Sequence, residues 1–157
     1  METFNLFPCD FSCAEHRKAL AALINVYIAD EMGGGEPLEA SEELRLAQGL
    51  EQHPSAVVLL AGVHGKYVGL LVAFENFSTF SVRPMINIHD VIVRPEYRGR
   101  GVGRLLMNGM IQEARRRGAA RITLEVRKDN LAAQHLYQSL GFEETSPGMY
   151  YWRKSLE

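Results

Sequence analysis

Apolar positions in the first third of the chain recur at helical spacing, which predicts two helices that each bury one face. The first is expected to begin at Ser12, where Ser12 and Glu15 have the spacing of a capping box, and to end before the glycine run 33–35. The second, shorter helix is expected to begin at Ser41 and to end at His53-Pro54.

The pattern then changes to one typical of strands. Ala56 to Val63 is a continuous apolar run, as expected of a strand buried on both faces. His64-Gly65 predicts a tight turn, after which Lys66 to Phe77 returns as the second strand of a hairpin. Met85 to Val93 is predicted to be a further strand of the same sheet.

The C-terminal half contains a long amphipathic helix that begins near Val102, carries arginines at 115–117 in its last turn and ends at Gly118. The remaining expected elements are an edge strand at Thr3 to Pro8, a strand at Arg121 to Val126, a helix at Asn130 to Leu140 and a strand-like segment around Met149 to Arg153. With no linker, repeat or low-complexity tract, residues 1–157 are interpreted as one α/β domain with a mixed sheet.

The composition of the chain argues against some classes of binding partner. A net charge of -2 and a pI of about 6.2 argue against wholesale binding to nucleic acid or an anionic membrane. No apolar run approaches the roughly 20 residues of a membrane span, and the N-terminus does not resemble a signal peptide, so we expect a cytoplasmic protein. Cys9 and Cys13 are interpreted as reduced thiols, because no second cluster of zinc ligands accompanies them.

The segment between the strand ending at Val93 and the helix beginning at Val102 has the features of an anion site. Its alternate glycines allow backbone N–H groups to approach a ligand, and the following helix adds free N–H groups and a positive dipole end. Its arginines add positive charge, so a diphosphate is the expected ligand. The candidate binding residues are Arg98, Gly99, Arg100, Gly101, Val102, Gly103 and Arg104.

The spacing fits neither a Rossmann fingerprint nor a Walker P-loop. Arg98, Gly101 and Gly103 instead form an Arg-x-x-Gly-x-Gly pattern, which resembles motif A of the GNAT acetyltransferase superfamily. Further along, Asn130 to Phe142 resembles the same superfamily's Asn-x-x-Ala-x-x-Leu-Tyr-x-x-x-Gly-Phe segment. The resemblance covers about two-thirds of the chain, from the hairpin to the C-terminus.

This resemblance implies a single-domain GNAT-like fold, with a mixed central sheet that splays between its fourth and fifth strands and about four flanking helices. It implies acetyl-CoA as the acyl donor, with pantetheine pairing to backbone groups of Val91 and Val93 and the pyrophosphate held by residues 98–104. Asn130 would bind the cofactor arm from the far side. Tyr137 would protonate the departing thiolate, although a tyrosine that merely packs under Phe142 is the alternative.

The acceptor amine must lose a proton before it attacks, and His89 and Asp90 are the candidate bases. Because successive strand residues face opposite sides, we expect one of the two in the cleft and the other against a packed layer. The layout here is similar to the diamine and thialysine acetyltransferase branch, which has a Glu-Asp pair at this point. This chain has the aspartate of that pair, Asp90, but has His89 in place of the glutamate. The alternative is a buried hydrogen-bonded couple with a structural role. Glu125 is a weaker candidate base.

The expected function is transfer of acetyl from acetyl-CoA to a primary amine of a small molecule, with no nucleic acid, metal or membrane involved and a homodimer left open. Acetylation of a protein N-terminus or lysine, and a non-catalytic acyl-CoA sensor, are the alternatives. Four other histidines are expected outside the site: His16, His53 and His64 at helix surfaces or turns, and His135 on an exposed helix face.

Overall fold

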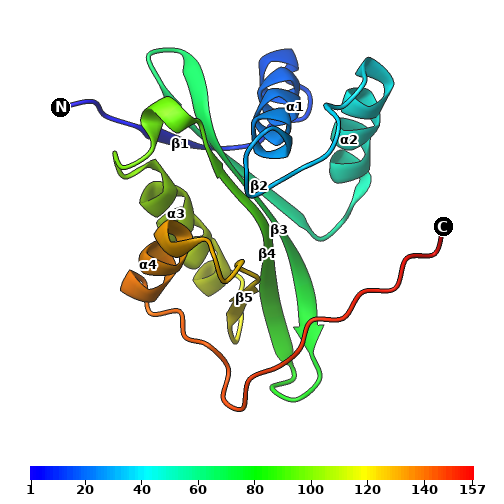
Figure 1. The fold of residues 1–157 in the computed structure, drawn as a ribbon, viewed down its shortest axis with the longest axis vertical. Coiled ribbons are helices and arrows are strands. Elements are labelled where there is room, and N and C mark those ends of the chain that lie inside the picture. The colour runs from blue at the N-terminus through cyan, green and yellow to red at the C-terminus, as the bar shows by residue number, and fades with distance from the viewer. The chain divides into compact units, whose positions relative to one another are not determined.

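A computed structural model describes residues 1–157, which divide into two units, Met1–Glu125 and Val126–Glu157. The first unit is built on a five-stranded sheet in the order β1-β2-β3-β4-β5 (Figure 1). The first four strands are antiparallel neighbours, and β5 is parallel to β4. The strands are β1 (Asn5–Pro8), β2 (Ala56–Val63), β3 (Lys66–Ser78), β4 (Arg83–Val93) and β5 (Ile122–Leu124).

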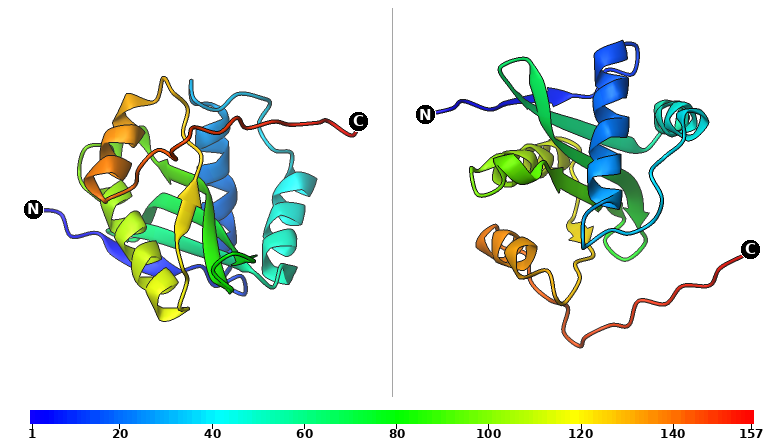
Figure 2. Two further views of the ribbon diagram at one scale, coloured as in Figure 1. Left: turned by 90° about the horizontal axis from the view of Figure 1, so that it is seen from below. Right: turned by 45° about the horizontal axis from the view of Figure 1, so that its top comes forward.

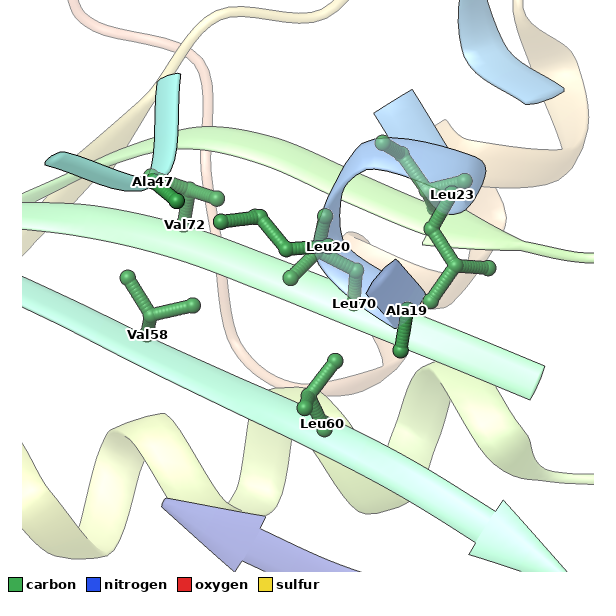
Figure 3. Close-up of a cluster of buried hydrophobic side chains, with 9 residues drawn as sticks. Ala19, Leu20, Leu23, Ala47, Val58, Leu60, Leu70 and Val72 are labelled. Carbon is green, nitrogen blue, oxygen red and sulfur yellow. The ribbon is translucent and has the colours of Figure 1, made fainter. Parts of the chain in front are cut away.

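Helices cover both faces of this sheet. The helices α1 (Ala14–Ile28) and α2 (Ala40–Gln52) lie on one face and α3 (Val102–Arg116) on the other (Figure 2). On the α1/α2 face, Leu20 and Leu23 of α1 pack with side chains of β2 and β3 (Figure 3). Ile92 of β4 belongs to the same cluster. On the α3 face, Leu106, Met107 and Met110 are fully buried. The continuous apolar sequence of β2 and β3 follows from this burial on two sides.

Close approach of α3 to the sheet depends on two glycines. A Cβ at Gly69 of β3 would lie 2.8 Å from Cγ1 of Val102, at the start of α3. A Cβ at Gly109, in the middle of α3, would overlap Cδ2 of Leu6 on β1. The lack of a side chain at these positions therefore sets how deeply α3 sits against the sheet.

Two helix starts differ from the sequence prediction. α1 begins at Ala14 with Cys13 as its N-cap, and the Ser12 hydroxyl does not cap the helix but donates to the Asp10 carboxylate at 2.6 Å. Asp10 draws Ser12 into a local turn, and such turns compete with helix caps. The N-cap of α2 is Glu39 rather than the predicted Ser41, because a capping box formed by Glu39 and Glu42 satisfies the first N–H groups of the helix.

The hairpin between β2 and β3 is confirmed, with His64 at φ 49° and Gly65 at φ 73° in its turn. The prediction for His16 is wrong. This side chain is buried, its Nδ1 accepts the Asp10 N–H at 2.8 Å, and its ring packs against Phe7 and Tyr67.

The second unit contains α4 (Leu131–Ser139), with Asn130 as its N-cap and Gly141 following in a left-handed conformation. The Asn130 side chain accepts the Ala133 N–H at 3.2 Å. The expected strand around Met149 to Arg153 is wrong, because these residues are extended, exposed and outside any helix or strand. A strand needs a backbone partner, and residues 126–157 contain no other strand that could supply one.

None of the helices is long and apolar enough to cross a membrane.

The fit of α3 against β1 can be tested with a pair of glycine substitutions. Gly109→Ala should destabilise the fold by up to about 2 kcal/mol, because the overlap of the new methyl group with Leu6 costs about 1–3 kcal/mol and the gain in helix propensity offsets about 1 kcal/mol of it. Gly49→Ala is the matched control: it lies in α2 with no atom within 4 Å of the added Cβ, and should stabilise by about 1 kcal/mol. Urea unfolding of both variants measures the two signs, and a stabilised Gly109→Ala would contradict the packing described.

Candidate active site

The fourth strand has a free edge over its second half. Its parallel pairing with β5 covers Ile86 to Ile88 and ends at the pair Ile88 and Leu124. β4 then continues to Val93, still paired to β3 on its other side. The expected separation of the fourth and fifth strands is therefore confirmed, and Val91 and Val93 lie on the stretch of β4 that β5 does not cover.

A β-bulge interrupts this strand at its two candidate bases. Asp90 is paired with Val72 of β3, whereas Ile88 is paired with Ala73, so His89 is an extra residue without a partner on β3. Asp90 shares the face of its partner Val72, which belongs to the α1/α2 core. His89 lies on the same face, because its ring packs on Phe74, two residues along β3 from Val72.

The expectation that only one of the two would face the cleft is therefore wrong. In a regular strand, consecutive side chains point to opposite faces, but the additional residue in a bulge breaks that alternation. Both His89 and Asp90 face the side of the sheet that α1 and α2 cover.

The Asp90 carboxyl group is half-buried, and burial raises its pKa above the usual value for an aspartate. The His89 imidazole partly offsets this effect by favouring the charged carboxylate. Asp90 and His89 are thus neighbours on one face of the sheet, and their charges interact.

Three aromatic rings form a row beside Asp90. The His53 and Phe74 ring centroids are 4.8 Å apart, and those of Phe74 and His89 are 4.7 Å apart, both in edge-to-face contact. His53 follows the last residue of α2, and its Nδ1 lies 3.2 Å from the Ser55 hydroxyl. The row connects the end of α2 to the bulge in β4, and it includes His53, which the sequence analysis had placed outside the site.

The glycine-rich loop at the end of β4 has the backbone that the sequence predicts. Gly99 and Gly101 have φ of 72° and 89°, a conformation that other residues rarely adopt, and no atom lies within 4 Å of a Cβ built on either. Gly101 is the N-cap of α3, and the N–H groups of the first turn have no partner within the helix. These groups and the helix dipole suit an anion.

Carboxylates engage two of the arginines expected to bind that anion. Arg98 donates from Nη2 to Asp30 Oδ2 at 2.7 Å and from Nε to the Val93 carbonyl at 3.0 Å. Arg100 donates to Glu2 at 2.8 Å and lies over the Tyr97 ring. These side chains hold the loop in shape even without a ligand.

Two of the other expected cofactor contacts depend on the backbone. Val102 is fully buried beneath Gly69, so only its main chain can reach a ligand. The Val93 carbonyl already accepts the Arg98 guanidinium and keeps one lone pair for a second donor. Glu125 is exposed and immediately follows β5.

Tyr137 and Asn130 belong to the second unit. Tyr137 is half-buried on α4, and its ring centroid lies 6.0 Å from that of Phe142, as the packing alternative expects. The Asn130 side-chain oxygen caps α4. Their roles towards a cofactor remain predictions.

Residues 13–142 match the model of the acetyltransferase (GNAT) family. The chain belongs to the GNAT family. It is 30% identical over 133 residues, which cover 85% of the chain and 87% of the relative, to the uncharacterized N-acetyltransferase YhfO of Bacillus subtilis. It is 35% identical over 86 residues, 52% of the chain, to the [ribosomal protein bS18]-alanine N-acetyltransferase of Salmonella typhimurium.

Other matches are more partial. The chain spans 58% of the length of the Salmonella relative and 37% of an uncharacterized N-acetyltransferase of Methanocaldococcus jannaschii. Among solved structures, a probable acetyltransferase superposes with a TM-score of 0.82 at 25% identity, with 99% of both chains covered. An aminoglycoside N-acetyltransferase in complex with CoA superposes with a TM-score of 0.76 at 17% identity, covering 99% of this chain and 97% of that one. This GNAT fold is the α/β arrangement expected from the sequence.

Two glycine substitutions should lower stability alike but differ in their effect on CoA binding. Gly101→Ala should cost about 1–2 kcal/mol, because an alanine at φ 89° is strained. Gly118→Ala, at φ 69° beyond the other end of α3, imposes the same kind of strain away from the loop. Both variants should unfold more easily, but only Gly101→Ala should weaken CoA binding in a calorimetric titration. Equal affinities in the two variants would remove the loop from the binding site.

The raised pKa of Asp90 predicts the sign of a stability change. A carboxyl group whose pKa is higher in the folded protein stabilises the fold only at low pH, and loses that contribution as pH rises through the folded pKa. Asp90→Asn should therefore raise the melting temperature at pH 7, with the gain shrinking towards pH 4, about the pKa of an unfolded aspartate. Asp129→Asn is the control of opposite sign, because Arg127 lowers the pKa of Asp129. A lower melting temperature for Asp90→Asn at pH 7 would instead favour the interpretation of Asp90 and His89 as a structural couple.

Proposed function

We propose that this chain transfers the acetyl group of acetyl-CoA directly to a primary amine of a small cationic acceptor. The observation that carries the proposal is the free edge of β4 between Ile88 and Val93, which runs from the His89 and Asp90 side chains to the anion-binding loop. A pantetheine arm laid along this edge would pair with the backbone as an added strand, with its pyrophosphate at the first turn of α3.

Two protons must leave the acceptor nitrogen, and one must reach the departing thiolate. The acceptor ammonium first gives a proton to Asp90 or His89, directly or through water, and its neutral nitrogen attacks the thioester carbonyl carbon. The C–N bond forms, the C–S bond breaks, and the thiolate leaves with the bonding electrons, while the nitrogen loses its second proton to the same base or to water and becomes the amide nitrogen. Tyr137 is the residue that the family resemblance assigns to protonate the thiolate. The raised pKa of Asp90 suits a base, because a carboxylate that holds its proton more tightly accepts one more readily.

The charge of the connection between α1 and α2 supports a cationic acceptor. These helices cover the face on which Asp90 lies, and the acceptor must arrive from that side. Between residues 19 and 44 the chain has no lysine, arginine or histidine. The charged residues of that stretch are Asp30, Glu31, Glu36, Glu39, Glu42 and Glu43; of these, Asp30 is paired with Arg98 and Glu42 lies 3.8 Å from Arg45. Such a negative surface raises the local concentration of a cation and favours its capture.

A second candidate acceptor is the α-amino group of a protein chain. It is favoured by the likeness to the Salmonella enzyme, whose name gives an alanine of ribosomal protein bS18 as its substrate. The two candidates differ in the size of the acceptor rather than in the reacting group.

One assay separates these proposals from a CoA-binding sensor. Thiol release from acetyl-CoA is followed with a panel of polyamines, aminoglycosides, amino acids and peptides with N-terminal alanine. The small-acceptor proposal expects the highest kcat/KM with a multiply charged small amine, and a fall in that rate at high salt. Preference for the peptides would favour the protein acceptor. Stoichiometric CoA binding with no thiol release from any amine would overturn both enzymatic proposals.

Tyr137→Phe tests the acid within the same assay. The substitution keeps the ring that packs on Phe142 and removes the hydroxyl, so the protein should still fold and CoA affinity should stay within error. With chemistry rate-limiting, kcat should fall about 10²–10⁴-fold, the range typical of a lost general acid. A kcat within twofold of the unmodified enzyme would leave Tyr137 with a packing role only.

A further inference from the structure

Asp30 lies just beyond the last residue of α1 and uses both of its carboxylate oxygens. Oδ1 accepts the Met32 N–H at 3.0 Å, and Oδ2 accepts the Arg98 guanidinium at 2.7 Å. The Met32 N–H and Arg98 together lower the pKa of Asp30, so the group is charged at neutral pH. Asp30 thus contacts two segments that are far apart in the sequence: the connection between α1 and α2 (residues 29–39) and the cofactor loop (residues 94–104).

Arg98 continues this contact to the strand. Its Nε donates to the carbonyl of Val93, the last residue of β4. A hydrogen-bonded chain therefore leads from the free edge of β4 through Arg98 and Asp30 to Met32. Only part of the guanidinium is used by these two bonds, so Arg98 can hold Asp30 and still donate to a phosphate.

Other bonds fasten the same connection to α1 alone. The Tyr27 hydroxyl donates to the Met32 carbonyl at 3.1 Å, and Asn25 Oδ1 accepts the Leu38 N–H at 2.9 Å. They fix where residues 29–39 leave α1, but they do not involve the cofactor loop. Asp30 differs because its second oxygen reaches Arg98.

We infer that Asp30 is a positioning residue that couples the two substrate sites: acetyl-CoA bound at the loop fixes Arg98, and Arg98 through Asp30 fixes the connection that borders the acceptor. The inference rests on the proposed function, which places the pyrophosphate at the loop and the acceptor on the α1/α2 face. Coupling of this kind is reciprocal, so an acceptor held by the connection also strengthens the binding of acetyl-CoA. The Asp30–Arg98 pair is partly exposed, with side chains 19% and 49% accessible, so the effect should be modest.

Hydrogen exchange with CoA alone as the probe tests the coupling without knowledge of the acceptor. In the unmodified protein, CoA should slow amide exchange in residues 98–104 and also in residues 30–34. Asp30→Asn keeps an oxygen for the Met32 N–H but removes the charge that holds Arg98. In this variant CoA should still protect residues 98–104 and should no longer protect residues 30–34.

Tyr27→Phe is the matched control. It removes a bond to Met32 from the same connection while leaving the Asp30–Arg98 pair intact, so protection of residues 30–34 by CoA should persist. A merely structural role for Asp30 would affect the two variants alike. Protection of residues 30–34 that survives in Asp30→Asn, or that is absent in the unmodified protein although residues 98–104 are protected, would overturn the coupling alone.

The proposed function is read separately in the same experiment. If CoA protects neither segment in the unmodified protein, the cofactor assignment fails and the coupling fails with it.

With the best amine from the acceptor panel, Asp30→Asn should raise the acceptor KM about five- to tenfold, the lower end of typical coupling. Its kcat at saturating substrates should change less than twofold, and an unchanged KM would contradict the inference.

Discussion

Beyond Ile88, β4 keeps a hydrogen-bonded neighbour on one edge and has no strand on the other. Backbone groups in such a position need a partner, and a ligand that carries amides can take the place of a strand. The surrounding elements are arranged about this edge: the glycine loop and α3 begin at its end, the bulge lies at its start, and the helices α1 and α2 cover one of its faces. The site thus follows from a sheet that stops pairing part-way along one strand.

Two neighbouring segments of the chain carry opposite charges. The loop after β4 carries Arg98, Arg100 and Arg104. In the connection between α1 and α2, by contrast, every charged residue is acidic. Where the two regions meet, Asp30 and Arg98 neutralise each other. The contact between the two segments is thus made by one charged residue from each.

Much of this arrangement is encoded locally and could be predicted. The alternate glycines of the loop are needed because Gly99 and Gly101 have positive φ, and the run Ala56–Val63 is apolar because both faces of β2 are covered. Other features depend on contacts between distant residues. The bulge at His89 exists only in the pairing of β4 with β3, and Asp10 takes the hydroxyl of Ser12 that would otherwise form a cap. The aromatic partners of His89, Phe74 and His53, come from other elements, so no local pattern could identify them.

The bulge also gives two neighbouring positions of β4 different constraints. Asp90 has a partner on β3 and a place in the ladder, so its surroundings constrain what can replace it. His89 is the additional residue, exposed apart from its contact with Phe74, and no opposite residue fixes its size or charge. Substitutions at His89 should therefore disturb the sheet less than substitutions at Asp90. A side chain of different size or charge can stand at this position while the strand that carries it keeps its place in the ladder.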